Sequence, residues 1–394
     1  MSATVTPVSR LQTHFFAVFA VFGCVTPFIP IYLRDVKGLN PAEIGYIFAT
    51  AQSGVLIMPI VMTFIADRYR IVRALLLTLF AFNIIGMGML ATTVGFWACL
   101  IWVALNRLAT QPQVALGDGL YFTLQNDPAQ PRATFSQVRV WGTIGFIVPS
   151  AIMFTIYELG GGVQWMPAVT AAMAIIGVIN STGMPRRTAA TKTPPKVPTL
   201  EAARVLLRPT VALFVVGCGF VVFTNMAFYS FYPLYLTQEV GISERWIGVI
   251  SSFGVGLEIL YMLSLERMRA RIGLGGILLV GGLASLFRLA CLGWLPTPFF
   301  AVFFQVFHGM TVLGFMVVPV MYLNEVAAEG FRNSIQGLYV MIVAGLFSIA
   351  GNIAAGQLAE IGLLTLYRVA FIVCAFGLAL IAASFRLRRR QATA

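Results

Sequence analysis

Two stretches of this sequence, one in each half, repeat the same residues at a constant spacing. The stretch PFIPIYLRDVKGLNPAEIGYI matches YSFYPLYLTQEVGISERWIGVI at an offset of 203 residues. The matched positions are Pro30, Tyr32, Leu33, Gly38, Ile44, Gly45 and Ile47 in the first half, and Pro233, Tyr235, Leu236, Gly241, Ile247, Gly248 and Ile250 in the second. A repeat of this length predicts that the chain is built from two similar halves.

Apolar residues are concentrated in twelve segments, each close to the ~20 residues that a helix needs to cross a bilayer. The chain is 59% hydrophobic and only 10% charged, with a mean hydropathy of +0.88, whereas soluble domains average roughly 25% charged residues. The segments are 15–34, 42–66, 73–92, 95–124, 134–157, 163–182, 209–238, 245–266, 273–295, 298–324, 333–357 and 362–385. The sequence therefore predicts an all-α polytopic membrane protein.

The longest polar interruption separates the two repeats and is rich in Pro, Thr, Ala and basic residues, which is typical of a linker. We expect an N-terminal six-helix bundle over residues 1–183, a cytoplasmic linker over 184–208 and a C-terminal six-helix bundle over 209–394. Two repeats of equal topology imply bundles related by an axis along the membrane normal.

Basic residues are distributed unequally between the two sides of the predicted membrane. Most of the 26 Lys and Arg residues lie in the loops on the side that carries both termini. Because basic loops face the cytoplasm, both termini are predicted to be cytoplasmic, in a multi-pass protein of the inner (plasma) membrane. The N-terminus lacks a small-residue cleavage site, so the first apolar segment is expected to be a retained helix rather than a signal peptide.

Two charged residues of the first half, Asp118 and Arg139, lie inside apolar segments on either side of a short polar turn. At 1.5 Å per residue, each lies roughly 10 Å from that turn, so we expect the two side chains to reach similar depths on antiparallel helices. A charge at such depth costs at least ~2.5–3.5 kcal/mol unless it is paired or hydrated. The pair either serves a solute pathway or only fixes the orientation of the helices.

Three ionisable residues of the second half, Glu258, Arg288 and His308, lie in three successive apolar segments. Their depths differ by only a few turns, so long side chains could bring them together. A group that combines a carboxylate, a guanidinium and an imidazole favours proton handling over a purely structural network. In the preceding segment, Phe228 and Tyr229 are deep enough to stack on a ligand, although aromatic stripes more often serve packing.

Asp67 and Arg68 end the second segment beside a basic loop. A carboxylate at a helix end can close a cytoplasmic gate by pairing with a neighbouring helix. The alternative is a solvated loop that follows the charge rule, which explains the arginines better than it explains Asp67.

Several kinds of chemistry have no motif in the sequence. It lacks a Walker A loop, a GxSxG elbow, an HExxH helix and a dinucleotide-binding glycine pattern, and its two histidines are too few for a histidine-built metal centre. The five cysteines are scattered singly, and the basic residues lie in membrane loops rather than among stacking aromatics. We therefore expect no enzyme activity, no metal, no cofactor and no nucleic-acid partner, and a proton gradient as the energy source.

Short motifs give a resemblance to a known family. The string Gln137-Val138-Arg139-Val140-Trp141-Gly142-Thr143-Ile144-Gly145-Phe146, together with Leu116 to Leu120, Gly256 to Glu258, Phe287-Arg288 and Phe307 to Thr311, is similar to the phenylpropionate permease group of the major facilitator superfamily, with lactose and nucleoside permeases as more distant relatives. The resemblance implies that Arg139 contacts substrate with Asp118 as its acidic counterpart. It also implies that Glu258, Arg288 and His308 form the proton-coupling side, although Thr311 stands where lactose permease has the coupling carboxylate.

The sequence as a whole predicts a monomeric proton symporter that imports a small organic solute, such as an organic or aromatic acid, a sugar or a nucleoside, across the lipid bilayer by alternating access. Asp118, Arg139, Trp141, Phe228 and Tyr229 are the candidate substrate-binding residues. A proton-coupled antiporter that exports drugs or metabolites is the first alternative. A membrane sensor or scaffold that binds without transporting is the second.

Overall fold

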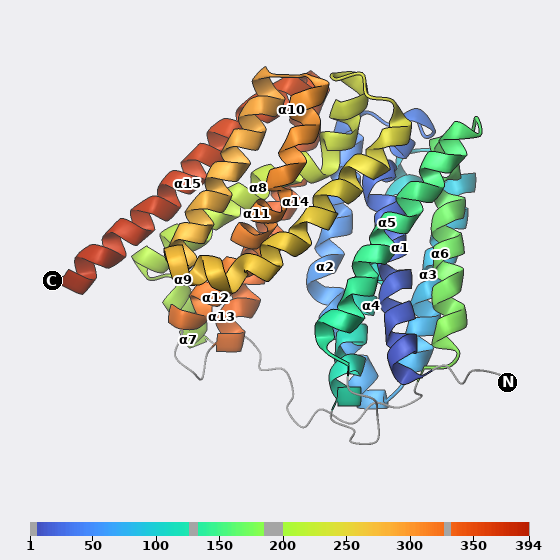
Figure 1. Cartoon of the computed structure of the whole chain (residues 1–394), viewed down its shortest axis with the longest axis horizontal. Helices are drawn as coiled ribbons and strands as arrows, with labels where there is room; N and C mark the ends of the chain where they lie inside the picture. Colours follow the sequence, from blue (N-terminus) through green and yellow to red (C-terminus); the bar gives the residue numbers. More distant parts are fainter. Residues whose placement is uncertain (1–5, 126–132, 185–199, 327–331, 394) are drawn as a thin grey trace. The chain divides into compact units, whose positions relative to one another are not determined.

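A computed structural model describes residues 6–125, 133–184, 200–326 and 332–393 of the chain, and the regular structure of these residues is entirely helical (Figure 1). The first half contains α1 (Pro7–Asp35), α2 (Pro41–Tyr69), α3 (Val72–Thr92), α4 (Phe96–Gln125), α5 (Phe135–Glu158), the short helix η1 (Val163–Trp165) and α6 (Met166–Ser181). These helices begin and end within a few residues of the predicted apolar segments, apart from the earlier start of α1, because polar loops interrupt the apolar runs there.

The second half begins with α7 (Leu200–Leu206), which lies inside the predicted linker, and continues with α8 (Pro209–Gln238), η2 (Glu244–Trp246) and α9 (Ile247–Trp294). The next crossing is assembled from α10 (Pro298–Phe303), η3 (Phe304–Phe307), α11 (His308–Val312), η4 (Leu313–Val317) and α12 (Val318–Val326). The chain ends with α13 (Arg332–Tyr339), η6 (Val340–Phe347), α14 (Ser348–Ile361) and α15 (Leu363–Thr393). Both η4 and η6 are π-helical turns.

The predicted twelve crossings are recovered once two helices are considered closely. Among the described residues, ten helices are long and apolar enough to cross a membrane, and α9 counts among them as one. Gly273 has a φ of 67° and divides α9 into two helices. The helix α4, which carries Arg107 and Asp118, is the remaining crossing. The all-α class predicted from the sequence is confirmed.

The chain forms two compact units, and each unit includes a short segment from the other half of the sequence. Unit 1 consists of residues 1–39, 50–194 and 243–252, and unit 2 of residues 40–49, 195–242 and 253–394. The two exchanged segments, 40–49 and 243–252, are separated by the same 203 residues that separate the sequence repeats. The repeat therefore extends from the sequence to the way each half packs.

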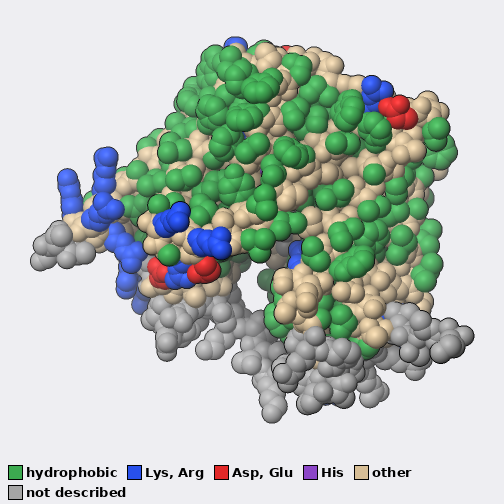
Figure 2. Space-filling model, viewed as in Figure 1, with side chains coloured by type: hydrophobic (Ala, Val, Ile, Leu, Met, Phe, Trp, Pro, Cys, Tyr) green, Lys and Arg blue, Asp and Glu red, His purple; other side chains and the backbone are tan. Residues whose placement is uncertain are grey.

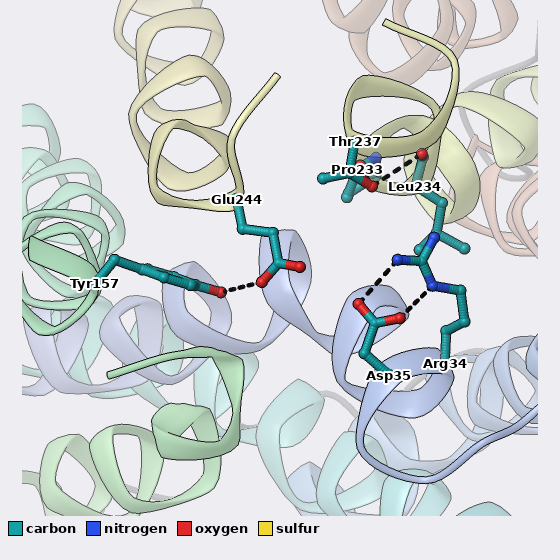
Figure 3. Close-up of polar contacts among 7 residues, drawn as sticks. All are labelled: Arg34, Asp35, Tyr157, Pro233, Leu234, Thr237 and Glu244. Carbon is teal, nitrogen blue, oxygen red and sulfur yellow. Dashed lines mark hydrogen bonds and ion pairs between the residues drawn. The ribbon is translucent and has the colours of Figure 1, made fainter. Parts of the chain in front are cut away.

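In unit 1, the segment that begins with η2 lies against the last turns of α5 (Figure 3). The Tyr157 hydroxyl donates a hydrogen bond to Glu244 Oε2 at 2.9 Å, and Arg245 forms an ion pair with Glu158 at 2.8 Å. Deeper in the unit, the Ser252 hydroxyl donates to Ser150 Oγ at 2.9 Å. The segment is therefore fixed by polar contacts along its length.

In unit 2, the start of α2 lies against α14. The backbone N–H of Ala42 donates to Glu360 Oε2 at 3.2 Å, and Gln357 Nε2 donates to the Tyr46 hydroxyl at 2.9 Å. Gly45 faces Gly356 so closely that a Cβ on Gly45 would lie 2.8 Å from its Cα. The small residues of α14 thus permit close packing against the start of α2.

The repeated turns that precede these segments have the same geometry in both halves. Gly38 and Gly241 take φ values of 68° and 73°, a left-handed conformation that glycine adopts without steric cost. In each turn the last helical carbonyls accept the same backbone hydrogen bonds, from Val36 and Lys37 to Tyr32 O, and from Glu239 and Val240 to Tyr235 O.

Large hydrophobic side chains cover much of the molecular face in Figure 2, and Lys and Arg side chains gather near the end of α15. Ile57, Phe64, Leu263, Leu346 and Ile372 are each more than half exposed. A chain that spans a membrane exposes such residues to lipid, since lipid takes the place of a protein core there. The surface agrees with a multi-pass membrane protein.

Candidate functional site

Arg139 lies one turn into α5, whose start is fixed by a capping box between Thr134 and Gln137. Its guanidinium stacks on two phenylalanines of α1, with the Cζ atom 4.1 Å from the ring centroid of Phe19 and 5.2 Å from that of Phe15. Gly142, one turn further on, leaves room for this stacking, because a Cβ there would lie 2.7 Å from Arg139 Nη1. Cation–π contact of this kind stabilises a guanidinium that has lost water.

Asp118 lies on α4, and the charge of Arg139 acts on its carboxylate. Its Oδ1 atom is buried and has no hydrogen-bond partner among the described residues. The two helices touch where the rings of Tyr121 and Phe135 meet. Elsewhere α5 packs on α1, and α4 packs on α3 and α1. The polar turn between α4 and α5 lies outside the described residues.

Trp141 follows Arg139 by two residues and therefore points away from it on the helix. Its side chain is 40% exposed. A second arginine of unit 1, Arg107, stacks on Phe22 at 4.8 Å. Three phenylalanines of α1, Phe15, Phe19 and Phe22, thus hold two intramembrane guanidinium groups that come from other helices.

In unit 2, Arg288 of α9 is fully buried, with 0% of its surface exposed. Its guanidinium lies over the ring of Phe228, 3.8 Å from the centroid, and its Nη2 donates a hydrogen bond to Asn225 Oδ1 at 2.7 Å. The Nε and Nη1 atoms are buried and have no hydrogen-bond partner within the part of the chain that the structure describes. We call Asn225, Phe228, Tyr229, Arg288 and His308 the Arg288 cluster.

His308 begins α11 beside the aromatic side chains of α8. Its ring centroid lies 6.1 Å from that of Phe228 and 5.9 Å from that of Tyr229, and the charge of Arg288 acts on it. Tyr229 is also within electrostatic reach of both Arg288 and Glu258. The Thr311 hydroxyl, which by resemblance stands in place of the coupling carboxylate, donates to the backbone oxygen of His308 at 2.8 Å.

The structure therefore gathers residues that the sequence assigned to two roles. Phe228 and Tyr229 were predicted to bind substrate, and Arg288, His308 and Glu258 to couple protons, yet all five lie in one neighbourhood of unit 2. Asn225 was missed by sequence reasoning. Its position three residues before Phe228 places both on one face of α8, which is the signal that could have identified it.

The predicted gate residues, Asp67 and Arg68, lie near the end of α2. Arg68 is exposed in the last turn of α2. The side chain of Asp67 lies outside the described residues. Among the described residues, no group of three or more His, Cys, Asp and Glu side chains is arranged to hold a metal ion.

A family model matches this architecture over nearly the whole sequence. The model described as MFS_1 like family covers residues 8–369. The chain belongs to this family of the major facilitator superfamily. It is accordingly a multi-pass membrane transporter of a small molecule and not an enzyme.

Similar proteins include several permeases of Escherichia coli (strain K12). Nucleoside permease NupG is 21% identical over 368 residues, covering 89% of this chain and 87% of the permease. The putative nucleoside transporter YegT is 26% identical over 378 residues, covering 89% and 84%. The probable 3-phenylpropionic acid transporter is 23% identical over 359 residues, covering 87% and 88%.

Solved structures give the same fold. The crystal structure of nucleoside transporter NupG superposes with a TM-score of 0.83 at 20% identity and covers 96% of this chain and 98% of that one. A variant of the same transporter gives a TM-score of 0.88 at 19% identity, covering 96% and 100%. At these identities the likeness establishes the fold and leaves the substrate open.

Proposed function

We propose that the chain is a proton-coupled symporter that imports a small organic solute by alternating access, as a monomer with both termini in the cytoplasm. The observation that carries the proposal is the placement of intramembrane charge. Unit 1 contains Asp118 and Arg139 in mutual electrostatic reach, and unit 2 contains Arg288, His308 and Glu258 around Tyr229. Buried ionisable groups are costly in a membrane and usually mark solute or proton pathways.

In this proposal, Asp118, Arg139 and Trp141 of unit 1 contact the solute. Arg139 is held against Phe15 and Phe19, so its guanidinium has a fixed orientation toward a ligand. Asp118 offers a carboxylate oxygen without a hydrogen-bond partner among the described residues. Trp141 contributes an aromatic surface.

The residues of unit 2 carry the coupled proton. Glu258 is the proposed carrier, since it is the carboxylate of this group, and Arg288 and His308 set the electrostatic environment around Tyr229. Phe228 and Tyr229 complete the solute contacts. Asp67 and Arg68 serve as the cytoplasmic gate.

Uptake by the purified protein in liposomes tests this proposal. A panel of organic acids, sugars and nucleosides is offered with an inward proton gradient and again after the gradient is collapsed. We expect accumulation of at least one solute that requires the gradient. Failure of every solute to accumulate, with protein that is folded and correctly inserted, would remove the symport mechanism.

The role of Glu258 has a matched control in Glu266, which lies on the same helix and is exposed. Glu258→Gln should abolish gradient-driven accumulation while exchange of solute across the membrane persists, because the neutral side chain imitates the protonated state. Glu266→Gln should accumulate solute like the wild type. Equal accumulation by the two variants would show that Glu258 does not carry the coupled proton.

The same liposomes separate the two alternatives. An antiporter moves protons in the direction opposite to the solute. A pH-sensitive dye inside the vesicles would therefore report a pH change opposite in sign to that of a symporter when solute is added. A sensor or scaffold binds solute without flux of either kind.

A further inference from the structure

Arg288 is a buried positive charge whose direct contacts are uncharged. Its hydrogen bond goes to an amide, Asn225, and one face of the guanidinium rests on Phe228. Tyr229, Tyr232, Tyr367 and Cys374, which also act on it electrostatically, are uncharged side chains at pH 7. The guanidinium has lost its water, and its Nε and Nη1 atoms donate to no described residue in exchange.

The unsatisfied atoms of this arginine are the ones that recognise anions. Nε and Nη1 have no hydrogen-bond partner within the described residues, and neither has His308 Nδ1 in the same cluster. Arginine donates N–H···O bonds to carboxylates, and these bonds are stronger when both partners are charged and water is excluded. A ligand anion at these atoms would give Arg288 the hydrogen bonds that it lacks among the described residues.

The contacts that hold Arg288 also fix its orientation. Stacking on Phe228 fixes the plane of the guanidinium, and the Asn225 bond fixes its rotation within that plane. A side chain fixed in this way is oriented in advance for a ligand. Tyr229, which is partly exposed, lies beside Phe228 and His308 with ring centroids 5.6 and 5.9 Å apart, and its ring is the surface nearest the cluster that a ligand body could contact.

We infer that Arg288 binds the carboxylate of the transported solute and that the solute is an organic acid with an apolar or aromatic body. This inference rests on the proposed function in treating the chain as a carrier of a small organic solute, and it narrows the solute class to carboxylates. It adds to Arg288 a direct contact with solute, beyond its influence on His308.

Binding to the detergent-purified full chain tests the inference without transport. The probes are 3-phenylpropionate, benzoate, hexanoate, acetate and inorganic phosphate, with 3-phenylpropionamide as the neutral match of the first, and the readout is titration calorimetry supported by thermal shift. We expect 3-phenylpropionate or another of the larger carboxylates to bind. Its neutral amide should bind at least tenfold more weakly, since a hydrogen bond to a charged group is lost.

Two substitutions at the cluster and one elsewhere locate the site. Arg288→Met should weaken carboxylate binding by tenfold to a hundredfold. Arg107→Met is the matched control, since Arg107 is also an intramembrane arginine stacked on a phenylalanine, Phe22, but lies in unit 1. It should bind carboxylates like the wild type.

Asn225→Asp tests the same point with Arg288 retained, and it remains informative if Arg288→Met does not fold. Asn225 Oδ1 lies 2.7 Å from Arg288 Nη2, so an aspartate of the same shape would pair with the guanidinium internally. Carboxylate binding should weaken at least tenfold in this variant. Unchanged carboxylate affinity in Asn225→Asp would overturn the inference.

The remaining outcomes distinguish this inference from the proposed function. If no carboxylate binds the wild type, or if the amide binds as well as the acid, water alone satisfies Arg288 and the inference fails. Proton-driven uptake of a neutral solute such as uridine would then still support symport. Carboxylate binding that depends on Arg288, without proton-driven uptake, would support the site and remove the symport mechanism.

Discussion

The close contacts at the start of α2 and of α9 predict that two glycines 203 residues apart tolerate no side chain. A Cβ on Gly45 would lie 2.7 Å from the backbone oxygen of Asn352 and 2.8 Å from Gly356 Cα, which are backbone atoms that cannot rotate away. A Cβ on Gly248 would lie 2.8 Å from the Phe28 ring and from Ser150 Cβ. Real Cβ contacts essentially never fall below 3.0 Å, so each alanine must displace its neighbours.

The expected magnitude follows from two opposing terms. Overpacking of this kind costs about 1–3 kcal/mol, while replacing glycine by alanine inside a helix stabilises it by about 0.5–1 kcal/mol. Gly256→Ala is the matched control, because Gly256 lies on the same helix as Gly248 and a Cβ there would have no described atom within 4 Å. It keeps the propensity gain without the clash.

The assay is the free energy of unfolding of each purified variant in detergent, with uptake measured in parallel. We expect Gly45→Ala and Gly248→Ala to be less stable than Gly256→Ala by about 1–3 kcal/mol. Gly45→Ala should show the larger loss, because its neighbours are backbone atoms, whereas Gly248 faces side chains that can shift. Stabilities equal to that of Gly256→Ala would show that the helices separate at no cost and would refute the reasoning.

Three further substitutions test single contacts. Arg139→Lys should lower solute affinity about tenfold, because a compact ammonium stacks less well on Phe19 than a planar guanidinium does, and a binding titration checks this. Asp118→Asn should change the free energy of unfolding by less than about 1 kcal/mol, since the burial cost of the carboxylate offsets its attraction to Arg139; a loss of several kcal/mol would show that the pair holds the helices together. Asn83→Leu should cost about 1–3 kcal/mol in unfolding measurements, because Gln113 Nε2 loses its buried acceptor 2.7 Å away; an unchanged unfolding curve would count against this network.

Most of the fold could be predicted from the sequence, because in a membrane each backbone polar group must be bonded within a helix and each helix must be apolar. The boundary between the two parts of α9 was harder to predict from the sequence. The stretch Arg267 to Arg271 is polar and reads as a loop, but arginine and alanine are good helix formers and the helix continues to Gly273. The same tendency of good helix formers explains α7 (LEAARVL), which forms inside the predicted linker.

The candidate site was predictable in its charges and unpredictable in their partners. Charge inside an apolar segment is visible from one helix alone, so Arg139 and Arg288 were identified. Their stacking partners, Phe19 and Phe228, come from other helices. No local pattern distinguishes these two from the many other phenylalanines of the chain, since the contact depends on how the helices pack.

The repeat explains why the two units share a scaffold and differ in chemistry. The turn glycines and the close-contact glycines recur at the offset of 203, and their local structures agree. The ionisable residues do not recur: at that offset Asp118, Arg139, Glu258, Arg288 and His308 correspond to Met321, Ile342, Val55, Ile85 and Leu105. Since packing is duplicated and charge is not, alanine at Gly45 and alanine at Gly248 should each destabilise the protein, whereas neither unit has a residue at the matching position that could replace Arg139 or Arg288.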